Sequence, residues 1–174
     1  MRALRTIPTL FLSTVMGAHA TAQAPVFLGP TTYVCTNDSP FDQSGLGSTF
    51  FLETFEDGFL NTPGVSASVG TPYTGFLTDS VDCDDGVIDG ISSTSTHSFF
   101  AQGGVLGITF TFDATALGSL PTRAGIVWTD GAGPTSFEAF DANGVSLGAL
   151  GPFDLWGPDL TGSTAEDRFF GVTT

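Results

Sequence analysis

The sequence predicts an all-β fold, an antiparallel β-sandwich of the jelly-roll type. After Ala24, no stretch of a dozen residues repeats apolar side chains at the 3.6-residue period of a helix. Short runs rich in aromatic and β-branched residues recur instead, separated by clusters of Gly, Pro, Asn, Asp and Ser. The closely spaced turn signals favour a sandwich or jelly roll. A parallel α/β fold would need crossover helices, which the sequence does not predict.

The predicted strands follow one another along the whole chain after residue 30. They cover residues 31–35, 49–55, 65–69, His97–Phe100, 104–112, 124–129, 135–141, 145–150 and 168–172. The clearest alternation lies near the end of 104–112, where Ile108, Phe110 and Phe112 would face one side and two threonines the other. This pattern is typical of a half-buried antiparallel strand.

Local signals place two connections. Asn143-Gly144 predicts a tight hairpin turn between strands 135–141 and 145–150, because Asn-Gly readily adopts the positive φ that such turns need. Asp113, as an N-cap, and Pro121, beyond the end, predict one helical turn between them.

The N-terminus predicts export. Residues 1–24 read as a signal peptide, with Arg2 and Arg5 before a short apolar stretch and Ala22-Gln23-Ala24 as the cleavage pattern. The apolar stretch is too short to span a bilayer, which needs about 20 residues. Residues 25–174 are then long enough for a single domain with its own core, and the protein is expected to be secreted or held at the cell surface.

Two cysteines, Cys35 and Cys83, lie in the exported part. In an oxidising compartment they are expected to form a disulfide, and the alternative is two free buried thiols. In the chain-entropy model, a disulfide between them would stabilise the folded state by about 3–4 kcal/mol, because it closes a loop in the unfolded chain.

The charge of the chain excludes two classes of partner. Four basic residues stand against 18 acidic ones, for a net charge of −14, and there is no lysine. Such a chain offers no surface for nucleic-acid phosphates and no polybasic membrane anchor. Removing the signal peptide would take away two arginines and no acidic residue, so the exported protein is more acidic still.

The densest acidic feature is the segment 79–90. Its five aspartates are Asp79, Asp82, Asp84, Asp85 and Asp89. Carboxylates this close repel one another unless a cation lies among them, and hard oxygen ligands suit Ca²⁺. The spacing does not fit an EF-hand, because Val81 and Cys83 would occupy positions that need acids. The alternatives left open are a Ca²⁺ site, a solvated acidic turn and a substrate-binding loop. The sequence Phe55-Glu-Asp-Gly58 reads as the end of a strand running into a turn.

Catalytic motifs are weak. Gly144-Val-Ser146-Leu-Gly148 matches the G-x-S-x-G string, but a nucleophile elbow needs a strand, a turn and a helix, whereas Ser146 falls inside a predicted hairpin. His97 has no second histidine near it at zinc-ligand spacing. A glutamate pair could support glycoside hydrolysis. Glu138, between Phe137 and Phe140, is the candidate because burial in the strand would favour its protonated form.

Carbohydrate binding is a more natural use of this scaffold, because sugars stack on exposed aromatic rings. The candidate stacking residues are Trp128, Trp156, Tyr33 and Tyr73. Of these, Trp156, in a Pro/Gly-rich loop, and Tyr73 are the expected ligand-binding residues, whereas Trp128 is expected in the core. Polysaccharide is therefore the expected partner.

The chain resembles a group of secreted bacterial proteins associated with PEP-CTERM sorting. The resemblance covers most of residues 25–174 and depends on segments 51–58, 61–65, 79–90, 125–131, 137–140 and 165–171. It implies export, a β-sandwich and a role at the cell surface or in an extracellular polysaccharide matrix, and it says little about activity. The Phe55-Glu56-Asp57-Gly58 segment also looks like the start of jelly-roll carbohydrate-binding modules, which implies that Glu56 and Asp57 join the Ca²⁺ ligands.

Two departures from that group are visible. The Pro-Glu-Pro motif, membrane helix and basic tail of the sorting signal are absent, so anchoring by that route is not assigned. The chain also stops at Thr174, where such proteins continue into a final strand, so the sandwich is expected to lack its last strand. An open sheet edge could then pair with another chain.

Taken together, the sequence predicts a secreted, non-catalytic binding protein of the cell surface or extracellular matrix, stabilised by Ca²⁺ and directed to carbohydrate. The alternatives are a secreted glycan-active hydrolase that uses a glutamate pair and a purely structural surface protein. The balance is against an enzyme.

Overall fold

The computed structural model describes residues 23–34, 36–41, 50–75, 78, 97–101, 107–129, 133–155 and 167–174. Several sequence predictions fall on other residues and are untested by it. They are nearly all of the signal peptide 1–24, the disulfide Cys35–Cys83, the acidic residues Asp79, Asp82, Asp84, Asp85 and Asp89, and Trp156.

The described chain is all-β, with antiparallel sheets. Its strands are β1 (Val26–Thr32), β2 (Val65–Ala67), β3 (Thr71–Thr74), β4 (His97–Phe100), β5 (Phe110–Phe112), β6 (Arg123–Trp128), β7 (Pro134–Phe140), β8 (Ser146–Asp154) and β9 (Arg168–Thr173). Two short helices, η1 (Thr36–Asp38) and α1 (Ala114–Leu117), complete the described elements.

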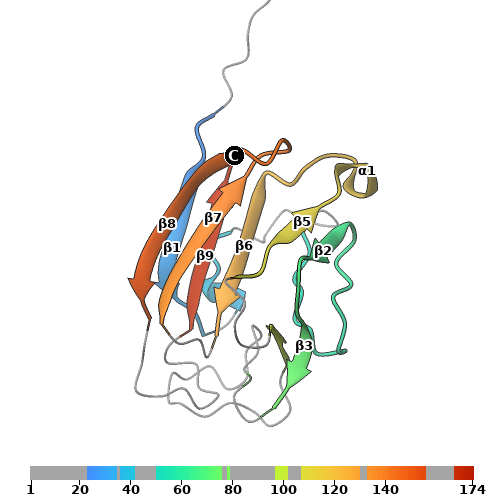
Figure 1. Cartoon of the computed structure of the whole chain (residues 1–174), viewed down its shortest axis with the longest axis vertical. Coiled ribbons are helices and arrows are strands. Elements are labelled where there is room, and N and C mark those ends of the chain that lie inside the picture. Colours follow the sequence, from blue (N-terminus) through green and yellow to red (C-terminus); the bar gives the residue numbers. More distant parts are fainter. Residues whose placement is uncertain are drawn as a thin grey trace, which may run out of the picture.

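The strands form one three-stranded sheet and three two-stranded pairs. The larger sheet has the order β1-β9-β6, and the pairs are β7-β8, β2-β5 and β3-β4. Figure 1 shows β7 and β8 lying over the β1-β9-β6 sheet, while β2, β3 and β5 lie to one side of it.

The core gathers around β9, whose inner residues are buried on both faces. On one face, the Phe169 ring packs with Tyr33 and Phe41. On the other, the Phe170 ring lies 6.1 Å from the rings of both Phe137 and Phe153, centroid to centroid, on the β7-β8 pair. Successive residues of a strand point to opposite faces, so the dipeptide Phe169-Phe170 supplies one ring to each of two layers.

Close approach to these rings requires glycine at specific positions. Gly29 has φ 99°, and a Cβ there would lie 2.1 Å from the backbone oxygen of Phe169. The register of β1 against β9 shifts between Leu28 and Thr31, which is a bulge at this glycine. A Cβ on Gly125 would lie 2.6 Å from the ring of Phe169. Glycine at these two positions therefore lets β1 approach the backbone of Phe169 and lets the Phe169 ring pack against β6.

The two predicted connections are confirmed. Strands β7 and β8 are joined through the Asn143-Gly144 turn, and Gly144 has φ 75°. The Asp141 carboxylate closes this turn, because its Oδ1 accepts hydrogen bonds from the backbone N–H groups of Asn143 and Val145 at 2.8 and 2.9 Å. At the helical turn α1, Asp113 is the N-cap and accepts from Thr115 N–H at 2.7 Å.

Some sequence predictions were wrong. Residues 50–55 of the predicted strand 49–55 are irregular. The N–H groups of Phe55 and Glu56 donate to the nearby Glu53 and Thr54 side chains, which competes with pairing to another strand. In the described part of 104–112, only Phe110–Phe112 is strand. Strand β3 was not predicted, since Pro72 lies within it. Glu138 is exposed, because Thr135, Phe137 and Ala139 take the inward positions of β7.

Candidate functional site

Two exposed aromatic rings lie side by side on the β3-β4 pair. Tyr73 is 51% exposed and Phe100 is 49% exposed. Their ring centroids are 5.8 Å apart, and the rings are tilted by 39°. In the register, Tyr73 is opposite Ser98 and Thr71 is opposite Phe100, so both rings and two hydroxyl side chains share one face of the pair.

The opposite face of β3-β4 fixes the pair to the rest of the molecule. Phe99 points to that face, and its ring centroid lies 5.3 Å from that of Phe55 and 5.2 Å from that of Phe110. On the face of the exposed rings, the Ser98 and Thr129 hydroxyls lie 3.3 Å apart, which links β4 to the end of β6. The Tyr73 ring rests against the backbone of Gly75, where a Cβ would lie 2.5 Å from the ring. The exposed rings therefore stand on a supported strand pair.

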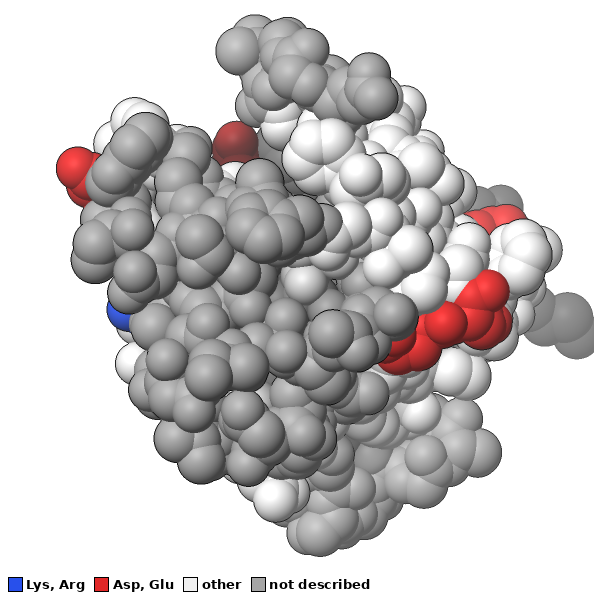
Figure 2. Space-filling view, turned by 90° about the horizontal axis from the view of Figure 1, so that it is seen from below, with Lys and Arg blue, Asp and Glu red and all other residues white. Residues whose placement is uncertain are grey.

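A turn rich in carboxylates lies beside this strand pair. Glu53 Oε2 accepts hydrogen bonds from the backbone N–H groups of Asn61 and Thr62, at 2.9 and 2.8 Å, and from the Thr62 hydroxyl at 2.9 Å. Gly58 N–H donates to the Phe55 carbonyl at 2.8 Å, which confirms the predicted turn at 55–58. Phe55 itself has φ 64°, an uncommon conformation for a bulky residue. Figure 2 shows acidic side chains on the side of the molecule that carries β2 and β3.

Glu56 reaches from this turn to the start of β4. Its Oε1 accepts from the backbone N–H of His97 at 3.1 Å, and its Oε2 lies 3.3 Å from His97 Nδ1. Asp57 stays within its own turn, where it accepts from Phe59 N–H at 3.0 Å and from the Asn61 side-chain amide. These two carboxylates, predicted to be Ca²⁺ ligands, thus have protein donors.

The predicted calcium site cannot be assembled from the described residues alone. Within the described ranges, no group of three or more His, Cys, Asp or Glu side chains is arranged to hold a metal ion. The five aspartates of segment 79–90 lie outside those ranges. His97 is the first described residue after Thr78, so the segment leads into the strand that Glu56 contacts.

The candidate catalytic groups are not brought together. Ser146 is the first residue of β8, in a hairpin and not at a strand-to-helix elbow. Gly148 of the same string has a packing role, since a Cβ there would lie 2.9 Å from the Phe27 ring. Exposed Glu138 lacks the burial that made it a candidate. Trp128, expected in the core, is partly buried, and its indole Nε1 is buried without a hydrogen-bond partner among the described residues.

Sequence reasoning singled out Tyr73 and missed Phe100. The signal for Phe100 was the dipeptide Phe99-Phe100 inside a correctly predicted strand. Consecutive side chains of a strand point to opposite faces, so one of the two rings must be exposed when the strand pair is covered on one face only. Which ring faces outward depends on the pairing with β3, and that strand was not predicted.

Comparison with known proteins identifies no relative. No protein-family model, no curated protein and no solved structure matches the chain. Among the described elements, none is a helix of the length and hydrophobicity needed to cross a membrane.

Proposed function

We propose that this protein is an exported, non-catalytic carbohydrate-binding protein, and that the Tyr73–Phe100 pair is its sugar-binding platform. The observation that carries the proposal is the presence of two half-exposed rings 5.8 Å apart on one face of a supported strand pair. Two adjoining exposed rings form an apolar patch of the kind that marks a ligand-binding surface. The C–H face of a pyranose fits such a patch, and the neighbouring Thr71 side chain offers a hydroxyl group to the sugar.

The proposed scaffold is a β-sandwich of the jelly-roll type. In support, β7-β8 lies over the face of the β1-β9-β6 sheet that carries Phe170, and Phe27, Phe137 and Phe153 pack between the layers. Strands that pack face to face with aromatic side chains between them are the unit from which such sandwiches are built.

Export and a place at the cell surface or in an extracellular matrix remain part of the proposal. They are supported by the N-terminal sequence 1–24 and by the resemblance to proteins associated with PEP-CTERM sorting. The large excess of acidic residues fits an exported protein that stays soluble among other macromolecules.

We also propose Ca²⁺ as a structural ion for the carboxylates of segment 79–90. Glu56, a predicted ligand, contacts His97 at the start of β4, which supports a role for the ion in fixing β4 and with it Phe100. Melting the protein in CaCl₂ and in a chelator tests this. A higher melting temperature with CaCl₂ is expected, and identical curves would contradict it.

The test of the main proposal is a binding screen of the purified protein against soluble polysaccharides, followed by single-site variants. Tyr73→Ala and Phe100→Ala should each weaken binding about five- to tenfold, since one stacked ring contributes about 1 kcal/mol. Phe140→Ala is the matched control, because Phe140 is also 49% exposed and lies in a strand, but stacks on no ring in the described part of the chain.

Four outcomes separate the alternatives. Loss of binding in the two platform variants alone supports the proposal. Release of reducing sugar that Glu138→Gln abolishes would favour the hydrolase and overturn it. Binding that Phe140→Ala weakens as much as Tyr73→Ala would move the site elsewhere, and the absence of any binding would favour a structural surface protein.

A further inference from the structure

A groove of about 490 Å³ opens on the β1-β9-β6 sheet, away from the aromatic platform. Its floor comes from one side chain of each strand, Leu28 of β1, Thr173 of β9 and Arg123 of β6. The register places these three on the face that carries Phe169. The remaining lining residues are Gln23, Pro40, Phe41, Thr122 and Thr174. Gln23 precedes the predicted cleavage point, so the proposed site consists of the other lining residues.

The walls of this groove are fixed by the core. Phe41 is only 9% exposed, and its ring meets Phe169 edge-on, with centroids 5.3 Å apart and an interplanar angle of 89°. Phe169 in turn lies against Gly125 and Gly171, and a Cβ on either glycine would come within 2.8 Å of the ring. At the end of the groove, Thr174 N–H donates to the Thr122 carbonyl at 3.0 Å. The groove is therefore formed before any ligand arrives, which is usual for small-molecule sites.

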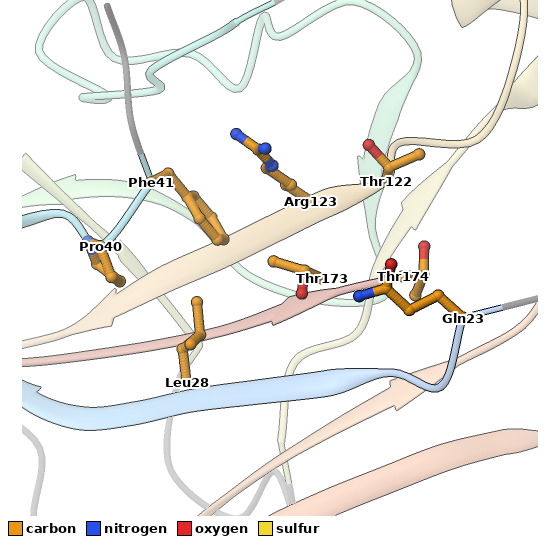
Figure 3. A pocket seen from close by; sticks show the side chains of 8 residues that line it. All are labelled: Gln23, Leu28, Pro40, Phe41, Thr122, Arg123, Thr173 and Thr174. Carbon is orange, nitrogen blue, oxygen red and sulfur yellow. The ribbon is translucent and has the colours of Figure 1, made fainter.

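Arg123 gives the groove a cation in a chain that has few. Only four basic residues stand against 18 acidic ones. Arg123 is exposed on β6, and within the described ranges no ion pair or hydrogen bond of its guanidinium is found. Arg168, by contrast, donates to the Asp167 carbonyl at 2.7 Å. Figure 3 shows Arg123 on the side of the sheet that Phe41 covers, with the Phe41 ring pointing from its own segment toward the strands.

We propose that this groove binds an acidic sugar of one or two rings. A planar guanidinium matches a carboxylate through two parallel hydrogen bonds, which favours a carboxylate-bearing ligand over a neutral one. The hydroxyls of Thr122 and Thr173 are partners for the hydroxyl groups of the sugar.

This site is distinct from the proposed platform. None of its lining residues belongs to β3 or β4. In Figure 1 the C-terminus, which lines the groove, lies at the top of the molecule, and β3 lies at the bottom. Ligand binding at each of the two sites can therefore be tested independently of the other.

The test is a titration of the purified, ¹⁵N-labelled protein with galacturonic acid at neutral pH, followed by NMR. The backbone amides of Arg123, Thr173 and Thr174 should shift. The methyl ester of the same sugar lacks the charge and should bind with an affinity at least about tenfold lower. The reason is that hydrogen bonds to charged groups are stronger than those to neutral groups. Arg123→Gln should bring galacturonic acid down to the affinity of the ester, whereas Phe140→Ala, which removes an exposed ring outside both sites, should change neither affinity.

Three results would overturn the inference. They are equal affinity for the acid and its ester, unchanged affinity in a folded Arg123→Gln variant, and an absence of shifts around the groove. If Arg123→Gln does not fold, the acid-versus-ester comparison on the unaltered protein decides. Failure of neutral polysaccharides to bind the platform leaves this test unaffected.

Discussion

β9 and the β3-β4 pair both carry aromatic side chains, but those of β9 are buried and two of those on β3-β4 are exposed. Phe169 and Phe170 are 4% and 0% exposed, whereas Tyr73 and Phe100 are about half exposed. β9 has a strand on each side and packed rings on each face. β3-β4 is a two-stranded pair with rings packed on one face, through Phe99. The place of a strand in the sheets, and not its aromatic content, therefore decides whether its rings are buried or exposed.

The largest expected effect is the difference between Phe170→Ala and Phe100→Ala. Removing a fully buried ring costs the lost burial and leaves a cavity, so Phe170→Ala should lower the free energy of unfolding by about 3–5 kcal/mol. Phe100→Ala removes a ring that is half in water and should cost less than about 1 kcal/mol. Urea unfolding curves give both values, and similar costs would contradict the division into core and surface.

The glycine that lets β1 approach β9 gives the next largest effect. Gly29→Ala forces a Cβ against the Phe169 backbone oxygen at a positive φ, so a loss of about 2–4 kcal/mol is expected. Gly144→Ala is the control, because Gly144 also has a positive φ but a Cβ there would meet nothing within 4 Å. It should cost only the backbone strain of about 1 kcal/mol. Thermal unfolding of the two variants should therefore differ clearly.

The carboxylate turn beside the platform should contribute less than the core. Glu53→Gln weakens three hydrogen bonds to Asn61 and Thr62, and a loss of about 1–2 kcal/mol is expected. Asp57→Asn is the exposed counterpart in the same turn and should cost less than Glu53→Gln. Chemical unfolding of both variants checks the order, and the reverse order would show that Glu53 does not organise the turn.

The smallest effect concerns the hairpin turn and depends on pH. The backbone N–H groups of Val145 and Asn143 hold the pKa of Asp141 below its ordinary value of 3.8. The folded state then binds fewer protons than the unfolded state near that pH, so the contribution is complete above about pH 5 and is lost as pH falls through the lowered pKa. Asp141→Asn should therefore lower the melting temperature slightly at pH 7 and not at pH 2. An equal decrease at both pH values would contradict this origin.

Local rules predicted the parts of the fold that depend on local chemistry. The Asn143-Gly144 turn, the Asp113 N-cap and the strand His97–Phe100 follow from short-range signals and are confirmed. The prediction for 49–55 failed over its described residues because the Glu53 and Thr54 side chains accept the N–H groups of Phe55 and Glu56, which a strand would pair with a neighbour. Strand order, which decides that β9 is central, depends on contacts between residues far apart in sequence and was not predictable.

Only one of the two rings of the candidate site could be predicted from the sequence. Tyr73 was singled out as an aromatic in a turn-rich region, but its partner Phe100 becomes visible only once β3 and β4 pair. Arg123 drew no attention in the sequence, because its position beside Phe41 and Thr173 arises from the packing of three strands. The acidic cluster, the most conspicuous sequence feature, falls on residues that the structure does not describe and stays a prediction.

The role of the exposed aromatic pair is tested most directly by where a bound glycan touches the protein. The measurement is the change in amide chemical shifts of ¹⁵N-labelled protein on addition of the neutral polysaccharide that it binds best. We expect the shifts to concentrate on Tyr73, Ser98 and Phe100. Shifts confined to β7-β8, or no shifts with any polysaccharide, would contradict the assignment of this pair as the binding platform.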